Sequence, residues 1–180
     1  MRKVVVYLLL SVDGVAEAPE DFVVDFDQVM NDHLGAAIGR QDTVLLGRVT
    51  YQEWAGYWPT ATEQPFADFI NGVQKYVATS SPLTKNWANT TAIDGSVTDF
   101  VRDLKSRSGN DIGVHGSITL TQSLLAEGLV DELRLVVVPT VLGAGRRLFD
   151  GTGSLPNVEL IESGRSPSGS LLVGYRVAGG

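Results

Sequence analysis

Residues 111–125, DIGVHGSITLTQSLL, combine the end of an apolar strand, a glycine turn and the start of a helix with leucines at four-residue spacing. Gly116 permits a positive φ and lets another group approach closely. Ser117 is a favoured N-cap residue, because its hydroxyl can bind a free amide of the first helical turn. Free amides and the helix dipole also attract anions. The stretch therefore has two interpretations, an ordinary capped strand–helix turn or a cradle for a diphosphate.

Length and composition predict one globular domain over residues 1–180, with 43% hydrophobic and 19% charged residues. The net charge of −7 argues against a nucleic-acid or anionic-membrane partner. The chain has no cysteine and only two distant histidines, so we expect neither disulfides nor a metal site. The apolar run near the N-terminus has the length of a strand, not of a membrane span. We therefore expect a soluble cytoplasmic protein.

Apolar segments alternate with helical patterns along the chain. Strands are predicted at 3–12, 43–46, 75–79, 112–114 and 132–139, with a weaker strand at 86–93. Helices are predicted at 28–39, from 48 onward, and at 66–73, 97–108 and 117–126. Two late strands, 155–163 and 170–177, form an antiparallel hairpin. This order indicates an α/β fold with a mostly parallel sheet covered on both faces.

Two further strand ends carry polar groups suited to a phosphate. Gly47 and Arg48 follow the strand at 43–46, and Ser80 and Ser81 follow the strand at 75–79. A guanidinium beside free helix amides suits a phosphate, although Arg48 paired with a surface carboxylate is the open alternative. Parallel strands end at the same edge of a sheet, so one long ligand with several phosphates could contact all three turns. Independent helix caps explain the turns equally, but they explain Arg48 less well.

Four segments in order resemble the dihydrofolate reductase-like superfamily. They are SVDGV at 11–15, TVLLGRVTYQEWAGYWP at 43–59, VATSSP at 77–82 and GVHGSITLTQSLLAEGLVDELRLVVVPTVLGAGRRLF at 113–149. The resemblance is strongest to single-domain bacterial proteins similar to the reductase domain of the riboflavin-biosynthesis deaminase–reductase, a 5-amino-6-(5-phosphoribosylamino)uracil reductase. It implies a three-layer α/β/α fold, NADPH as cofactor, hydride transfer and a homodimer.

The resemblance also implies which residues bind NADPH. The nicotinamide would lie beside Leu9, Val12, Asp13 and Gly14. The adenosine end and its phosphates would contact Gly47, Arg48, Val49 and Thr50, with Ser80 and Ser81 near the 2′-phosphate. The diphosphate and one side of the nicotinamide would contact Val114, His115, Gly116, Ser117, Ile118 and Thr119. The folate enzymes usually have glycine at the position of His115, so a side chain projects here.

Hydride transfer needs a proton donor, for which Asp13, Glu17, Asp25, Asp27 and His115 are candidates. Asp13 and Asp27 are our predicted catalytic residues. Asp25 is a predicted substrate anchor, and Tyr57 and Trp58 could stack on a planar substrate. The alternatives are that these acids are solvated loop residues and that the two aromatic residues pack in the core.

Three functions follow from the sequence. The first is an NADPH-dependent reductase that acts on a small heterocyclic or carbonyl substrate. The second is an NADP(H)-binding or ligand-sensing module without turnover, suggested by the lack of an unambiguous proton donor. The third is a dimeric interaction protein that binds no dinucleotide. Dihydrofolate reductase activity itself fits the motifs less well, and the sequence does not identify the substrate.

Overall fold

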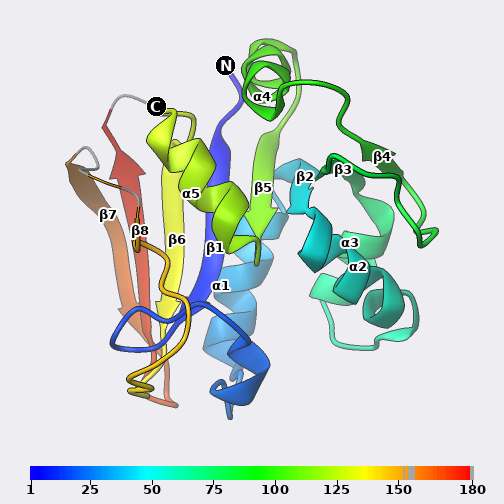
Figure 1. Cartoon of the computed structure of the whole chain (residues 1–180). Coiled ribbons are helices and arrows are strands. Elements are labelled where there is room, and N and C mark those ends of the chain that lie inside the picture. The colour runs from blue at the N-terminus through cyan, green and yellow to red at the C-terminus, as the bar shows by residue number, and fades with distance from the viewer. Residues whose placement is uncertain (152, 154–156, 179–180) are drawn as a thin grey trace.

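A twisted β-sheet forms the centre of the computed structural model, which describes residues 1–151, 153 and 157–178 (Figure 1). Within these residues the strands are β1 (Val4–Leu10), β2 (Gln41–Gly47), β3 (Gln74–Ala78), β4 (Thr90–Ala92), β5 (Asp111–His115), β6 (Glu132–Val137), β7 (Val158–Arg165) and β8 (Leu171–Val177). Their order across the sheet is β4-β3-β2-β5-β1-β6-β8-β7. The strands from β4 to β6 are parallel, whereas β8 and β7 are antiparallel to their neighbours. This confirms the predicted mostly parallel sheet with a C-terminal antiparallel hairpin.

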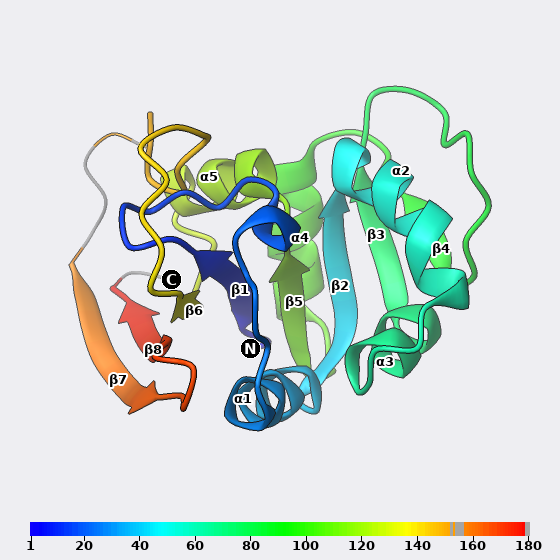
Figure 2. The same cartoon turned by 90° about the horizontal axis from the view of Figure 1, so that it is seen from below.

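Helices cover both faces of the sheet (Figure 2). They are α1 (Gln28–Ile38), α2 (Arg48–Tyr57), α3 (Phe66–Gly72), α4 (Val97–Ser106) and α5 (Ile118–Ala126), with short 3-10 turns η1 (Pro19–Asp21) and η2 (Trp58–Thr60). One core packs Val6 and Leu8 of β1 against α4 and α5, and the other packs Tyr7 of β1 against α1, α2 and α3. Strand β1 reads VVVYLLL without alternation because both of its faces are buried.

Two predicted strands have different bounds in the structure. The weak strand expected at 86–93 is only β4, because Asn89 has a left-handed backbone conformation, with φ of 55°, and Trp87 packs against Tyr51. The first hairpin strand, expected at 155–163, is β7 from Val158 to Arg165. Residues 155 and 156 lie outside the described part of the chain.

No helix in the described residues is both long and apolar enough to cross a bilayer. The longest of them, α1, has 11 residues and extends about 16 Å, against about 30 Å for the hydrocarbon core of a membrane. In the same residues no group of three or more His, Cys, Asp or Glu side chains is arranged to hold a metal ion.

Candidate functional site

The turns that follow β2 and β5 are in direct contact. The backbone N–H of Gly47 donates to Ser117 Oγ at 2.8 Å, and Ser117 Oγ donates to Thr50 Oγ1 at 2.9 Å. Gly47 allows this approach because a Cβ at its position would lie only 3.3 Å from Ser117 Oγ. The first turns of α2 and α5 therefore lie side by side at the carboxyl edge of the sheet.

Ser117 occupies the N-cap position of α5, as predicted, but its hydroxyl does not bind an amide of the first helical turn. Its hydroxyl is bound to Gly47 and Thr50, and α5 has no side-chain cap. The reason is the strand order, since β5 lies next to β2 and brings Ser117 against the start of α2. The Ser117 hydroxyl therefore connects α5 to the start of α2 and does not cap α5.

The absence of capping distinguishes α2 and α5 from α1 and α4. Asp27 caps α1 by accepting from Met30 N at 3.0 Å, and Ser96 caps α4 by accepting from Asp99 N at 3.2 Å. Helix α2 begins after Gly47, which has no side chain to offer, and like α5 it has no side-chain cap. The first amides of a helix have no acceptor within the helix. Two adjacent uncapped first turns therefore form an anion-attracting surface.

Arg48 adds a positive charge to this surface. Its side chain is exposed, and its Nη1 donates to Gln52 Oε1 at 3.2 Å. Among the described residues it forms no ion pair, so the alternative of a surface carboxylate partner is not what the structure shows. The neighbouring Val49 is also exposed. Thr50 is half-buried, and its Oγ1 accepts a hydrogen bond from Ser117.

An open cavity of about 700 Å³ lies at the carboxyl ends of β3 and β4. Ser80 and Ser81 are on one wall, in a turn that Thr79 shapes by accepting from Ser81 N at 3.1 Å. The opposite wall is residues 92–95, and Asp94 is the charged residue of the cavity lining. Because Ala78 pairs with Gly47, the cavity is adjacent to the start of α2. The structure thus brings the second and third predicted turns to one edge.

The loop after β1 is fastened by Asp13. This carboxylate accepts from Leu142 N at 3.1 Å, Gly143 N at 2.9 Å and Ser11 Oγ at 2.8 Å, and Arg147 Nη2 lies 3.2 Å away. The hydrogen bonds from the Leu142 amide, the Ser11 hydroxyl and the Gly143 amide hold the pKa of Asp13 well below its usual range. These contacts argue against the predicted catalytic role, because an anion held by four donors has no proton to give.

The rest of this loop is open toward solvent. Val12 is exposed, and Gly14 has φ of 83° with no atom within 4 Å of where a Cβ would be. Leu9 precedes the loop, in β1, where it is half-buried against the core. Their predicted place beside a nicotinamide ring is compatible with this open surface and stays a prediction.

The side chain of His115 is buried on the face of the sheet covered by α1 and α3. It packs against Phe66, Phe69 and Tyr7 with ring centroids 5.3, 6.0 and 6.0 Å away, and its Nε2 lies 2.8 Å from Gln41 Oε1. Burial lowers its pKa to about 3, so the imidazole is neutral. His115 is therefore a core residue. Contrary to the expectation from the sequence, its side chain does not project toward the diphosphate, and its burial argues against a role as proton donor.

The other residues of the turn between β5 and α5 differ in how accessible their side chains are to a ligand. Val114 and Ile118 are buried in the core under α5, so their side chains are not available to a ligand. Gly116 has φ of 75°, which confirms the predicted positive φ. A Cβ there would lie 3.1 Å from Trp54, which packs beneath the turn. Thr119 is exposed, and its Oγ1 accepts from Arg146 Nη2 at 2.7 Å.

Asp27 is also a structural residue. Besides capping α1 it accepts from Ser168 N at 3.0 Å, which ties α1 to the turn between β7 and β8. Burial raises the pKa of Asp27, but the hydrogen bonds from the Ser168 and Met30 amides outweigh this and lower it to about 2. This argues against a catalytic proton donor. Asp25, by contrast, is exposed, and within the described residues nothing hydrogen-bonds to its carboxylate.

The two predicted stacking residues differ. Trp58 packs edge-to-face on Phe66 and Trp54, with centroids 4.8 and 5.9 Å apart, which supports the packing interpretation. Tyr57 is about half exposed, and its hydroxyl donates to Glu63. Tyr57 therefore keeps one accessible ring, whereas Trp58 belongs to an aromatic cluster.

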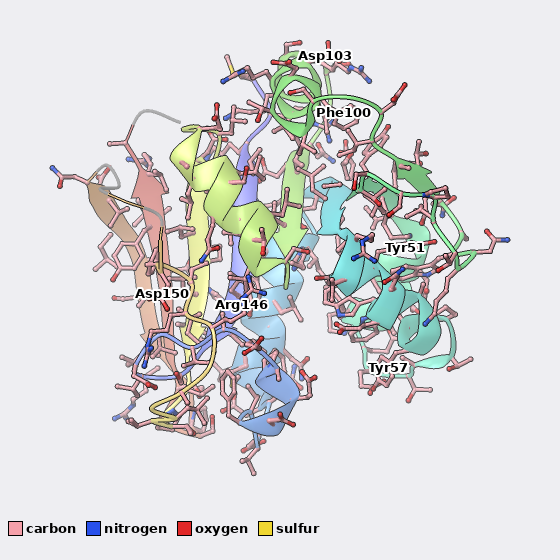
Figure 3. All side chains as sticks on the ribbon, viewed as in Figure 1. Tyr51, Tyr57, Phe100, Asp103, Arg146 and Asp150 are labelled. Carbon is pink, nitrogen blue, oxygen red and sulfur yellow. The ribbon has the colours of Figure 1, made fainter. Side chains whose placement is uncertain are left out.

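Arg146 places a further cation beside the start of α5, which the sequence analysis did not single out. It lies in the loop between β6 and β7, beside the start of α5 (Figure 3), where it donates to Thr119. Its backbone N–H also donates to Glu17 at 3.2 Å. The glycine-rich GAGRR segment signalled a loop, but nothing local indicated that this loop returns to α5.

Comparison with known proteins decides the family. The profile of the RibD C-terminal domain matches residues 2–172. The chain belongs to the RibD C-terminal domain family. The protein YyaP of Bacillus subtilis strain 168, which is uncharacterized, is 29% identical over 184 residues, covering 97% of this chain and 94% of YyaP.

Solved structures of related fold agree with this assignment. A putative riboflavin biosynthesis protein from Shewanella sp. PV-4 superposes with a TM-score of 0.77 at 20% identity, covering 97% of this chain and 98% of that one. Dihydrofolate reductase from Enterococcus faecalis, complexed with NADP(H), superposes with a TM-score of 0.59 at 13% identity, covering 98% and 96%. The predicted dihydrofolate reductase-like fold is thereby confirmed, and membership of the RibD family supports a reductase-like function.

Proposed function

We propose that this protein is an NADPH-dependent reductase that transfers hydride to a small heterocyclic or carbonyl substrate. The observation that carries the proposal is the pair of adjacent uncapped helix starts, α2 and α5, joined by Ser117 and flanked by the exposed Arg48. This arrangement leaves backbone donors and a cation at one point, which suits a diphosphate.

The cofactor would extend along the carboxyl edge of the sheet. The first-turn amides of α2 and α5 would hold the diphosphate, and the cavity beside Ser80 and Ser81 would receive the adenosine end. The open loop surface at Val12 and Gly14 would accommodate the nicotinamide. Bound there, the nicotinamide would supply the hydride, and the chain would orient it and exclude water.

The residues that anchor the substrate are fewer than predicted. Asp13 and Asp27 are held as anions by structural contacts, and His115 is buried. Of the five candidate donors, Asp25 is the exposed carboxylate to which no described residue hydrogen-bonds, so we assign to it the polar edge of the substrate. Tyr57 supplies the accessible ring that could contact a planar substrate.

The pair of uncapped helix starts also favours a second function, a dinucleotide-binding module without turnover. Structural hydrogen bonds engage Asp13 and Asp27, and His115 is buried, which disfavours three of the five candidate proton donors, whereas the two helix starts have no side-chain cap. Oxidation of NADPH that requires an added substrate, and that is lost in the Asp25→Ala variant, would eliminate this second function.

The Arg48→Ala variant tests the proposal through binding. We expect its Kd for NADPH to rise about tenfold, since a hydrogen bond to a charged group contributes about 1.5–3 kcal/mol, and its Kd for NADH to rise less. Arg107→Ala removes another exposed arginine, which follows α4 and pairs with Asp103, and should change neither value. Equal weakening of both cofactors would contradict a role of Arg48 at the 2′-phosphate.

A further inference from the structure

The cavity at the ends of β3 and β4 carries a negative charge at the place where the proposed cofactor puts its adenosine ribose. Its lining includes the hydroxyls of Thr79, Ser80 and Ser81 and the carboxylate of Asp94, but neither lysine nor arginine. Asp94 is exposed, and no hydrogen bond or ion pair from the described residues engages it. Its carboxylate is therefore free to meet a ligand.

The backbone holds Asp94 at the rim of the cavity. Strand β4 ends at Ala92, and the amide of Ile93 still donates to Val77 O at 2.9 Å, which continues the pairing with β3 up to the residue before Asp94. Gly95 then turns the chain with φ of 79°, and Ser96 caps α4. Asp94 is thus fixed between a paired strand and a capped helix, and its position does not depend on a long mobile loop.

A carboxylate at this position distinguishes the two nicotinamide cofactors. It can accept a hydrogen bond from the 2′-hydroxyl of NADH, as acidic residues do in other dinucleotide sites. The 2′-phosphate of NADPH instead brings a charge of about −1.5 to −2 at neutral pH. Repulsion over about 5 Å in a solvent-filled cavity corresponds to a loss of about fivefold to tenfold in affinity.

We infer that Asp94 is a specificity-determining residue that weakens binding of the 2′-phosphate and favours the 2′-hydroxyl. It opposes Arg48, which attracts the phosphate from the adjoining turn, so the chain accepts NADH as well as NADPH. This inference rests on the proposed function, because it concerns the adenosine end of the same site.

The test is a titration of the wild type and of Asp94→Asn with NADPH and with NADH, followed by nicotinamide fluorescence. Asparagine keeps the size of the side chain and removes its charge. We expect the ratio of Kd for NADH to Kd for NADPH to rise about fivefold to tenfold in the variant at low ionic strength. The rise should shrink at high ionic strength, because salt screens exposed charges.

Asp32→Asn is the matched control, since it removes one exposed negative charge from α1, outside the cavity lining. The inference is overturned if the ratio in Asp94→Asn stays within twofold of the wild type, or if Asp32→Asn changes it as much. A wild type that binds neither cofactor would refute the proposed function itself. A wild type that binds both, with an unchanged ratio in the variant, would refute only the role of Asp94.

Discussion

The imidazole of His115 shows how one residue can have a structural role at the edge of a candidate site. Its neighbours are three aromatic rings and Gln41, and burial lowers its pKa to about 3. The folded protein therefore keeps His115 neutral at pH values where the unfolded chain protonates it. Because the unfolded state binds more protons between about pH 6.5 and pH 3, the free energy of unfolding should fall as the pH falls through this range.

The variant His115→Gln removes this proton linkage and keeps a polar group near Gln41. We expect the wild type to lose up to about 1.4 kcal/mol more stability per pH unit than the variant over this range. Urea unfolding at about pH 7 and about pH 5 measures the difference. If the free energy of unfolding changes equally with pH in the two proteins, the fold does not hold His115 neutral.

The junction of α2 and α5 depends on a single hydroxyl. Ser117 is buried, accepts from Gly47 N and donates to Thr50 Oγ1. Replacement by alanine leaves the Gly47 amide without its acceptor, so we expect Ser117→Ala to lower the free energy of unfolding by about 1–2 kcal/mol. Ser123→Ala, on the exposed side of α5, is the control and should change stability by less than about 0.5 kcal/mol. Equal stability of the two variants in urea would contradict the bridging role.

The elements themselves were largely predictable, because their signals are local. The apolar run of β1, the glycine at the end of β2 and the leucine spacing of α5 each indicate one element without knowledge of the rest. The partner of Ser117 was not predictable, since Gly47 is 70 residues away and becomes its neighbour only through the order of the strands.

The same limit applies to the candidate site. Gly47, Arg48 and Gly116 could be found from turn chemistry, and the structure places them together. The structural contacts of Asp13 and Asp27 could not be predicted, because a carboxylate in a loop looks the same in sequence whether it binds substrate or accepts hydrogen bonds from Leu142, Gly143 and Ser168. The burial of His115 could not be predicted either, because the sequence does not show on which face of the sheet its side chain lies.

At the scale of the molecule, the β7–β8 hairpin extends beyond the helices that cover the sheet (Figure 1). Leu160 and Val158 on β7 and Leu171 on β8 are each about half exposed. They lie on one face, because Leu160 is opposite Tyr175 and Val158 is opposite Val177 in the ladder, and Leu171 is an even number of residues from both partners in β8. An apolar strand face of this kind is typical of a protein interface, and we propose that it carries the homodimer expected from the sequence.

Sedimentation velocity tests this proposal. We expect the wild type to sediment as a dimer and Leu160→Asp as a monomer, since the carboxylate would have to be desolvated in the interface. Val24→Asp adds the same charge at an exposed valine outside β7 and β8 and should remain dimeric. A monomeric wild type, or a dimeric Leu160→Asp, would contradict the proposal.

The other proposals depend on the binding of a nicotinamide dinucleotide at the paired helix starts of α2 and α5. Thermal unfolding of the purified protein without ligand, with NADPH and with NADH tests it most directly. A ligand that binds only the folded state, at about 100 times its Kd, adds about 2.7 kcal/mol of stability. We predict a clear rise in Tm with NADPH and a smaller rise with NADH. No rise with either cofactor would contradict the account, and the relation to the reductases would then be one of fold alone.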